Sequence, residues 1–349
     1  MARPVSRGHE IERFILWNVE ANPSNIVTKT AEHFGISRPA AFRYVKKLVG
    51  DRALLARGTT RNTKYELAVL EEKVINLSLS GIEEDSVWAE HFRPLVERFA
   101  PNVRALCHYG FTEMLNNAIE HSEGRSAELR FTRTAKSLEF QITDDGVGIF
   151  EKIQKSLGLA YPSEAILELA KGKFTTDPSR HSGEGIFFTS RICDGFMIMS
   201  RGHAFTVLEG QDWIMEAPQI LSGTAIAMEV DPQTKRTTKE IFDKFTTDLE
   251  EYGFDRTVVP IFLAKAGEDQ LVSRSQAKRV LARVERFKEV VLNFNDVESI
   301  GQAFADEIFR VFANQHPEVH LQVINASQDV HRMINRAKAA RDEMGGQAE

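Results

Sequence analysis

The sequence has few cysteines, no long hydrophobic run and no internal repeats, and these absences narrow the class of protein. Its two cysteines, Cys107 and Cys193, form no metal-type spacing and lie in apolar surroundings, which predicts buried free thiols. No apolar segment is long enough to span a bilayer, and the first residues lack the apolar core of a secretory signal. We therefore expect a cytoplasmic protein with no membrane partner.

Charge is unevenly distributed along a chain of otherwise ordinary composition. The 349 residues, 42% of them hydrophobic, are enough for two or three domains. Residues 1–67 carry twelve Lys/Arg against six Asp/Glu, a net charge of +6, whereas the remainder carries 32 against 44, a net charge of −12. A basic N-terminal segment joined to an acidic body indicates that one end of the chain meets a polyanion.

The first 70 residues alternate short helical patterns with turn signals. Apolar spacing predicts a helix within residues 8–20, and Thr28 is the expected N-cap of a second helix that stops at Gly35. Ser37 is the expected N-cap of a third helix with a basic outer face. Residues 53–67 then predict two short strands around a turn rich in Gly, Thr and Asn.

Residues 1–70 with these features resemble the winged helix-turn-helix family. The resemblance implies double-stranded DNA as the partner, with residues 37–49 in the major groove and the wing on the phosphate backbone. The DNA-binding residues that it implies are Ser37, Arg38, Arg43, Lys46, Lys47, Arg57, Arg61 and Lys64. Winged helices also serve as protein–protein adaptors, but the charge asymmetry favours DNA. Because such proteins often read paired half-sites, we expect a homodimer.

A helix in the middle of the chain combines an apolar stripe with an unusual polar edge. Residues 109–123 read YGFTEMLNNAIEHSE, with Phe111 and Leu115 on the apolar stripe. Glu113 and Asn117 are four residues apart, so both project from one side of the helix. A carboxylate and an amide that converge there can hold a metal ion and a water molecule.

Three glycine-containing motifs follow this helix. An alternating strand at residues 138–142 leads into DDGVG at residues 144–148, where glycines allow the backbone to approach a ligand closely. Gly183 and Gly185 then lead into a helical pattern, and free N–H groups at a helix N-terminus bind phosphate. Finally, Thr224 precedes another alternating strand. Each motif alone does not identify a function, and it is the order of the motifs along the chain that is specific.

In this order the motifs resemble the GHKL ATPases, the superfamily of gyrase-type, chaperone-type, mismatch-repair and histidine-kinase ATP-binding domains. The resemblance covers residues 75–232, and the segments EMLNNAIEH and GKFTTD are most similar to the histidine-kinase and anti-sigma branch. It implies a central α/β sandwich that binds ATP and Mg²⁺. The implied activity is that of a Mg-dependent ATPase or a protein kinase, and the motifs alone do not decide whether ATP is hydrolysed, transferred or only bound.

The resemblance implies a role for each matching residue. Glu113 matches the carboxylate that activates water in hydrolysing members, Asn117 matches the Mg²⁺ ligand, and Asp144 matches the adenine-binding residue. The implied nucleotide-binding set is Asn117, Asp144, Gly146, Gly148, Lys173, Gly183, Gly185 and Thr224.

The intervening lid carries cations and two departures from the family pattern. Lys171, Lys173 and Arg180 either pair with phosphates or are solvated lid charges. His181 stands where another glycine is common, and Glu184 stands where leucine is usual. A carboxylate near the phosphates is expected to weaken nucleotide binding unless it is paired or points away.

The last segment alternates strands and helices after a charged helical connector at residues 233–255. Residues 257–264, 289–295 and 319–326 predict strands separated by amphipathic helices, which is a small α/β layer. Residues 256–340 resemble the STAS-like domains of anti-anti-sigma factors, in which a loop serine is phosphorylated.

The position of that serine carries no hydroxyl in this chain, which favours a docking module for a protein partner or a second protomer. Ser299 lies a few residues earlier. It is either the phosphoacceptor or, as its position suits better, the N-cap of a helix that begins at Ile300.

These patterns together predict a multidomain α+β protein: an N-terminal winged helix, a central GHKL α/β sandwich and a small C-terminal STAS-like α/β layer. The favoured function is an ATP-binding, DNA-binding transcriptional regulator whose nucleotide state controls its conformation and its binding of DNA or a partner. Two alternatives stay open. One is a serine or histidine protein kinase, for which His91 is a poorly matching acceptor, and the other is a scaffold with a degenerate ATP site.

Overall fold

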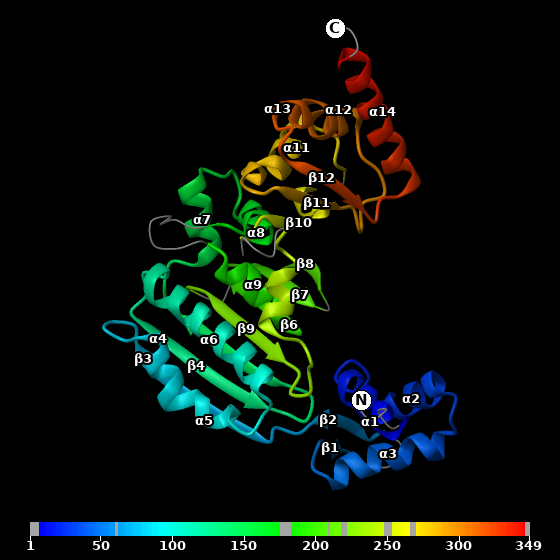
Figure 1. Cartoon of the computed structure of the whole chain (residues 1–349). Coiled ribbons are helices and arrows are strands. Elements are labelled where there is room, and N and C mark those ends of the chain that lie inside the picture. Colours follow the sequence, from blue (N-terminus) through cyan, green and yellow to red (C-terminus); the bar gives the residue numbers. More distant parts are fainter. Residues whose placement is uncertain are drawn as a thin grey trace.

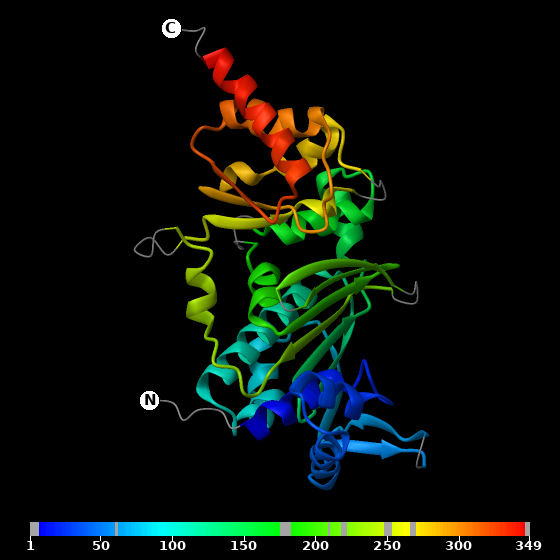
Figure 2. The same cartoon turned by 90° about the vertical axis from the view of Figure 1, so that its right-hand side faces the viewer.

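Three parts follow one another along the molecule. The computed structural model describes residues 7–59, 62–174, 183–208, 210–217, 222–247, 253–265 and 270–345. The N-terminal part lies at one end of a large central sheet, and the C-terminal part lies beyond the other end (Figures 1 and 2). No helix within the described ranges is both long and apolar enough to cross a membrane.

The N-terminal part consists of three helices and a two-stranded hairpin. Its elements are α1 Arg7–Asn18, α2 Ile26–Phe34, α3 Arg38–Gly50, β1 Leu54–Arg57 and β2 Lys64–Leu67, with β1 and β2 antiparallel. The Ser37 side chain caps α3 by accepting a hydrogen bond from the Ala40 N–H (3.3 Å), as predicted. Gly35 ends α2 in the left-handed conformation, also as predicted (φ 61°).

The expected start of α2 was wrong. The helix begins at Ile26, after the N-cap residue Asn25, and not after Thr28. Ile26 is completely buried in the small core of this part, next to Ile15 and Val45. Because burial of Ile26 stabilises an earlier helical turn, packing decides the boundary although Asn25 makes no side-chain cap.

The central part is built on a seven-stranded sheet in the order β3-β4-β5-β9-β6-β7-β8, and every neighbouring pair is antiparallel. Its strands are β3 Glu71–Ser78, β4 Ser126–Arg133, β5 Leu138–Asp144, β6 Gly195–Ser200, β7 His203–Leu208, β8 Gln211–Glu216 and β9 Ala225–Val230. Its helices are α4 Glu84–Val87, a π-helical turn Trp88–Phe92, α5 Arg93–Val96, α6 Pro101–His121, α7 Ile149–Leu157, α8 Pro162–Lys171 and α9 Gly185–Ile192.

The apolar stripe of α6 forms the centre of the core. Figure 1 shows α6 lying across one face of the sheet. Phe111 and Leu115 are buried there, and the Phe111 ring is 5.9 Å from the ring of Phe140 on β5. Cys107 and Cys193 are buried free thiols, as predicted, and burial raises the pKa of both. This packing leaves the polar edge of α6 facing away from the sheet core.

The C-terminal part has three strands that alternate with helices, as predicted, and the structure shows that the three strands form a parallel sheet. Its elements are β10 Arg256–Pro260, α11 Arg274–Leu281, β11 Glu289–Asn293, α12 Gln302–Asp306, a π-helical turn Glu307–Phe312, α13 Ala313–Gln315, β12 His320–Ile324 and α14 Gln328–Gly345. The strand order is β10-β11-β12. The first strand is shorter than expected, because Ile261–Lys265 form a 3₁₀-helix.

Two further expectations in this half of the chain need correction. Ser299 is exposed and is not an N-cap, because α12 begins at Gln302 after Gly301. Ile300 instead forms an isolated parallel bridge with Leu271, which holds the chain extended before the helix. Within the connector, the described helix is only α10 Thr238–Asp243, and residues 248–252 lie outside the described ranges.

Candidate functional site

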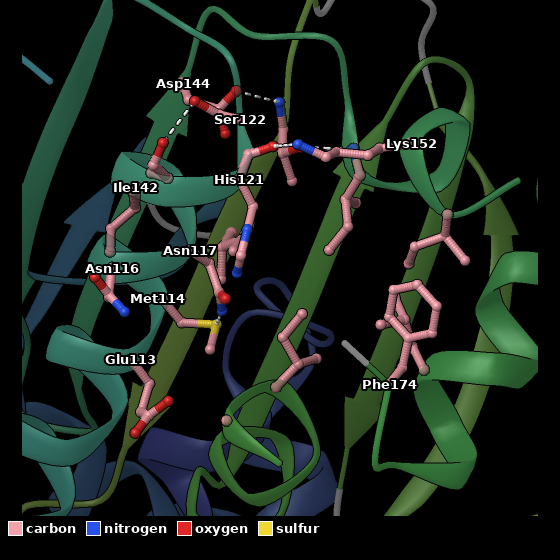
Figure 3. Close-up of a pocket in the computed structure, with 18 of the residues that line it drawn as sticks. Glu113, Met114, Asn116, Asn117, His121, Ser122, Ile142, Asp144, Lys152 and Phe174 are labelled. Carbon is pink, nitrogen blue, oxygen red and sulfur yellow. Dashed lines mark hydrogen bonds between the residues drawn. The ribbon is translucent and has the colours of Figure 1, made fainter. Parts of the chain in front are cut away.

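Most of the residues predicted to bind nucleotide line one pocket. It has a volume of about 300 Å³ and lies between the polar edge of α6, the end of β5 and the first turn of α9 (Figure 3). The lining includes Glu113, Asn117, Asp144, Gly148, Gly183, Gly185 and Thr224. We call this cavity the α6 pocket.

Asp144 presents a buried hydrogen-bond acceptor to the α6 pocket. Its Oδ1 accepts hydrogen bonds from the backbone N–H groups of Gly146 (2.9 Å) and Thr224 (3.2 Å). Within the described ranges, its Oδ2 has no hydrogen-bond partner. Burial raises the pKa of the Asp144 carboxyl, and the two N–H donors offset part of this effect. The carboxylate is thus oriented through one oxygen and offers the other to a donor.

The backbone around Asp144 is held by close packing and by Thr224. A Cβ atom on Gly146 would lie 2.1 Å from the carbonyl oxygen of Ser122, so only glycine fits between the Asp144 loop and the end of α6. Gly146 therefore supports the α6 pocket from behind and does not line it. The Thr224 hydroxyl accepts a hydrogen bond from the Ile149 N–H (3.0 Å), which ties β9 to the first turn of α7.

Glu113 and Asn117 face the α6 pocket from neighbouring turns of α6, as the spacing predicted (Figure 3). The Asn117 amide nitrogen lies 4.0 Å from the Met114 sulfur, and its amide oxygen has no hydrogen-bond partner in the described part of the chain. The Glu113 carboxylate lies against the first turn of α9, where a Cβ atom on Gly185 would be 2.1 Å from Oε2. Gly185 therefore permits an anionic group to approach the N-terminus of α9.

Negative charge gathers on the α9 side of the pocket. Burial raises the pKa of Tyr109, and the carboxylates of Glu113 and Glu184 raise it further. Glu184, which departs from the family pattern, is the N-cap residue of α9 and lines the α6 pocket. A triphosphate without a cation would meet these carboxylates unfavourably. In the described residues, no group of three or more His, Cys, Asp or Glu side chains is placed to hold a metal ion.

The lid lysines do not line the α6 pocket. Lys173 was predicted to bind nucleotide, and Lys171 was expected either to pair with phosphates or to be solvated. The buried Lys171 ammonium donates to Glu168 Oε1 (2.7 Å) and to the Arg279 carbonyl (2.6 Å). The Lys173 ammonium donates to the Arg286 carbonyl (3.1 Å) and does not line the pocket. Both face the C-terminal part because α8 packs on it. Arg180 and His181 lie outside the described residues.

Sequence analysis missed the apolar walls of the pocket and one cation. The walls are formed by Met114, Ala118, Ile142, Ile149, Ile153, Leu169, Phe174, Ile186, Phe187 and Ile226. Lys152 lines the pocket and donates to the His121 carbonyl (2.7 Å) and to Glu123 (2.9 Å), so it caps the end of α6 (Figure 3). The alternating pattern of the strand that contains Ile142 could have predicted that Ile142 is part of an apolar wall. No local sequence pattern predicted that Lys152 lines the pocket.

The candidate DNA-binding residues differ in what they contact. Arg38, Arg43 and Lys46 are exposed on α3. Lys47 pairs with Glu12 (2.5 Å), and Arg57 pairs with Glu66 across the hairpin, with 2.8 Å between charged atoms. Lys64 is exposed at the start of β2, the Ser37 side chain is used in capping, and Arg61 lies outside the described residues.

Comparisons with known families agree with two of the three parts. Residues 103–234 match the family described as histidine kinase-, DNA gyrase B-, and HSP90-like ATPase. Residues 276–331 match a family described as a STAS-like domain of unknown function. Neither match covers the N-terminal part, and a comparison with curated proteins found no match. The central ATPase-like and C-terminal STAS-like assignments are thereby confirmed.

Proposed function

We propose that the chain binds ATP with Mg²⁺ in the α6 pocket and that the bound nucleotide regulates its conformation. The observation that carries this proposal is the buried Asp144 carboxylate, whose Oδ1 is held by two backbone donors while Oδ2 faces the pocket without a hydrogen-bond partner in the described ranges. Such an acceptor suits an exocyclic amine of a base. The family match of residues 103–234 supports the same assignment.

The residues of the pocket fit both ligands. Asp144 Oδ2 would accept from the adenine amine, and apolar side chains such as Ile149 and Ile153 would cover the base. The Asn117 amide oxygen is a suitable Mg²⁺ ligand, since Mg²⁺ prefers oxygen and is commonly held by few protein groups together with phosphates and water. The ion would offset the charges of Glu113, Glu184 and the phosphates.

Titration calorimetry of the native chain with ATP tests this proposal. We expect saturable binding in the presence of Mg²⁺ and much weaker binding when the metal is chelated. GTP serves as the matched control, because its base presents a carbonyl oxygen where adenine presents an amine. Absence of ATP binding, or equal binding of GTP, would overturn the assignment of Asp144 as the base-binding group.

Acidification is expected to weaken ATP binding at a higher pH than for an ordinary aspartate. Burial raises the pKa of Asp144 above 3.8, and the protonated carboxyl is a poorer acceptor for the amine. The effect of Asp144 on folding has the opposite sign. A raised native-state pKa means that its contribution to stability is full below the unfolded pKa and is lost as pH rises through the folded pKa. Calorimetry across the acidic range, with thermal melts at each pH, separates the two effects.

For the N-terminal part we propose double-stranded DNA as the ligand. Arg38, Phe42 and Lys46 are exposed at intervals of four residues along α3, so they share one face of that helix. The exposed Phe42 lies between two cations on this face. Its apolar ring would suit contact with a base edge, while the cations on either side would suit contact with phosphates. If the N-terminal part were instead a protein–protein adaptor, the surface of its partner would have to match the same positive charge.

Removal of two cations from this face is expected to weaken DNA binding and its salt dependence. The double variant Arg38→Ala/Lys46→Ala should lower the slope of log affinity against log salt by about 2, because each phosphate contact contributes about 0.9. Fluorescence anisotropy with a mixed-sequence duplex measures this. Lys155→Ala, which removes an exposed charge from α7, is the control. An unchanged slope in the double variant would favour the adaptor role.

Protein kinase activity is the second candidate, because the ATPase family that matches includes histidine kinases by its description and a STAS-like domain follows it. Incubation with γ-labelled ATP distinguishes the outcomes. Label retained on this chain or on an added partner would support a kinase. Release of phosphate alone supports a switch that hydrolyses ATP, and binding without either reaction supports a switch driven by binding. Absence of ATP binding supports a scaffold with a degenerate ATP site.

A further inference from the structure

Helix α8 buries charged residues although it belongs to the lid region of the central part. All residues from Glu164 to Lys171 are buried, including Glu168. Charged side chains are rarely buried unless they are paired. The C-terminal part covers them, since α8 lies directly beside β10 (Figures 1 and 2). The lid helix is thus docked on a different part of the chain.

Ion pairs with α11 and the residues after it hold this contact. Arg279 Nη1 lies 2.7 Å from Glu164 Oε1, and Arg283 Nη1 lies 3.3 Å from Glu168 Oε2. The Lys171 ammonium pairs with Glu168 (2.7 Å) and donates to the Arg279 carbonyl. Both carboxylates of the buried face of α8 are therefore matched by arginines of the C-terminal part.

Hydrogen bonds from side chains to backbone carbonyls extend the contact in both directions. Lys171 also donates to the Ala282 carbonyl (3.0 Å), so its ammonium caps the C-terminal end of α11. The Thr257 hydroxyl of β10 donates to the Lys171 carbonyl (2.6 Å). These bonds join the end of α8 to β10 and to the end of α11.

The same segment supplies a wall of the α6 pocket. Leu169 of α8 and Phe174 line that pocket. The Arg283 guanidinium lies over the Phe174 ring, 5.0 Å from its centroid. Arg283 therefore contacts Glu168 on the buried face of α8 and Phe174 on the pocket wall at once.

The backbone of Arg283 is unusual for a residue with a side chain. It has a φ of 66°, in the left-handed region that favours glycine. An unfavourable conformation of this kind persists where the surroundings fix it. The guanidinium of this residue contacts both Glu168 and Phe174.

The N-terminal part is attached at the ends of β5 and β9 that lie away from the α6 pocket. Antiparallel strands β5 and β9 reach Asp144 and Thr224 at the pocket end. Just beyond their other ends, Lys136 pairs with Glu20 (3.1 Å) and Asp231 pairs with Arg13 (2.6 Å). The N-terminal part is thus attached to the sheet, whereas the C-terminal part is attached to helix α8.

We propose that the C-terminal part positions the wall of the nucleotide pocket through α8, with Arg283 as the positioning residue. Nucleotide binding and docking of the C-terminal part are then one coupled equilibrium. The proposal rests on the proposed ATP site. Because coupling is reciprocal, ATP tightens the docking of α8, and anything that loosens this docking weakens ATP binding.

Arg283→Gly tests this role with little backbone strain, since glycine suits the left-handed conformation. Glu168 keeps Lys171 as its partner in this variant. We expect affinity for Mg²⁺-ATP to fall about tenfold, within the usual range of coupling between sites. Arg283→Lys should recover only part of it, because lysine lacks the planar group that stacks on Phe174 while pairing with Glu168. Arg332→Ala, an exposed arginine on α14, should bind ATP as the native chain does.

Amide hydrogen exchange of α8 provides a second readout that needs no nucleotide. Exchange in α8 should be faster in Arg283→Gly than in the native chain, and ATP should slow it in the native chain. Native affinity in Arg283→Gly, or unchanged α8 exchange, would overturn the positioning role. Failure of the native chain to bind ATP would refute the proposed function and the coupling, while the exchange comparison would still report whether Arg283 holds α8.

Discussion

Asp144→Asn is expected to weaken Mg²⁺-ATP binding by about 100-fold or more while the chain stays folded. The asparagine oxygen can still accept from the Gly146 and Thr224 N–H groups that hold Oδ1. Its amide nitrogen would then occupy the position of Oδ2 and present a donor to the donor amine of adenine. Loss of a hydrogen bond to a charged group costs about 1.5–3 kcal/mol, and the opposed donors add to this.

The fold is not expected to suffer from this substitution. Burial raises the pKa of Asp144, which means that the ionised carboxylate has a desolvation cost in the folded chain, and a neutral amide removes that cost. A thermal melt should show a midpoint at or above that of the native chain, and calorimetry should show the loss of binding.

Asp145→Asn is the matched control for charge. Asp145 is exposed, and its carboxylate accepts hydrogen bonds from the N–H groups of Arg125 (2.7 Å) and Ser126 (3.0 Å), away from the pocket. We expect ATP affinity within a few fold of native in this control, with a modest loss of stability. Equal losses of affinity in the two variants would show that general charge, and not the acceptor at Oδ2, governs binding.

Glu113→Gln is expected to separate nucleotide binding from turnover. If Glu113 orients and deprotonates the attacking water, phosphate release should fall by about 100-fold or more, in the range for loss of a general base. Binding should be kept or become tighter by a few fold. The substitution removes an anion from the first turn of α9, where the phosphates are expected.

Measurement of phosphate release and of ATP affinity on the same preparation decides this prediction. Glu120→Gln is the control, because Glu120 is exposed on the same helix and does not line the α6 pocket. Unchanged turnover in Glu113→Gln would show that the Glu113 carboxylate does not act as the general base and only contributes to the structure at the end of α9. A drop in affinity would contradict the electrostatic argument.

The sequence alone determined the elements whose cause is local. The stripe and polar edge of α6 follow from the 3.6-residue period, which brings Glu113 and Asn117 together. The strand before Asp144, the left-handed Gly35 and the Ser37 cap follow from equally short-range rules. Each of these inferences depends on residues close together in the chain. Asp144 and Thr224 are 80 positions apart, and only the resemblance to a known family implied that they share one pocket.

Only the tertiary structure decided which partners the charged residues of the lid would have. Lys173 was predicted to bind nucleotide, and Lys171 was expected either near phosphates or in solvent. Lys171 instead donates to a carbonyl 108 positions away, and Lys173 donates to one 113 positions away. Likewise, burial of Ile26 set the start of α2, and a bridge at Ile300 displaced the start of α12. A long charged side chain carries no local signal for its partner, since desolvation and pairing depend on which distant surface packs against it. Burial of α8 by the C-terminal part is therefore a property of the assembled fold.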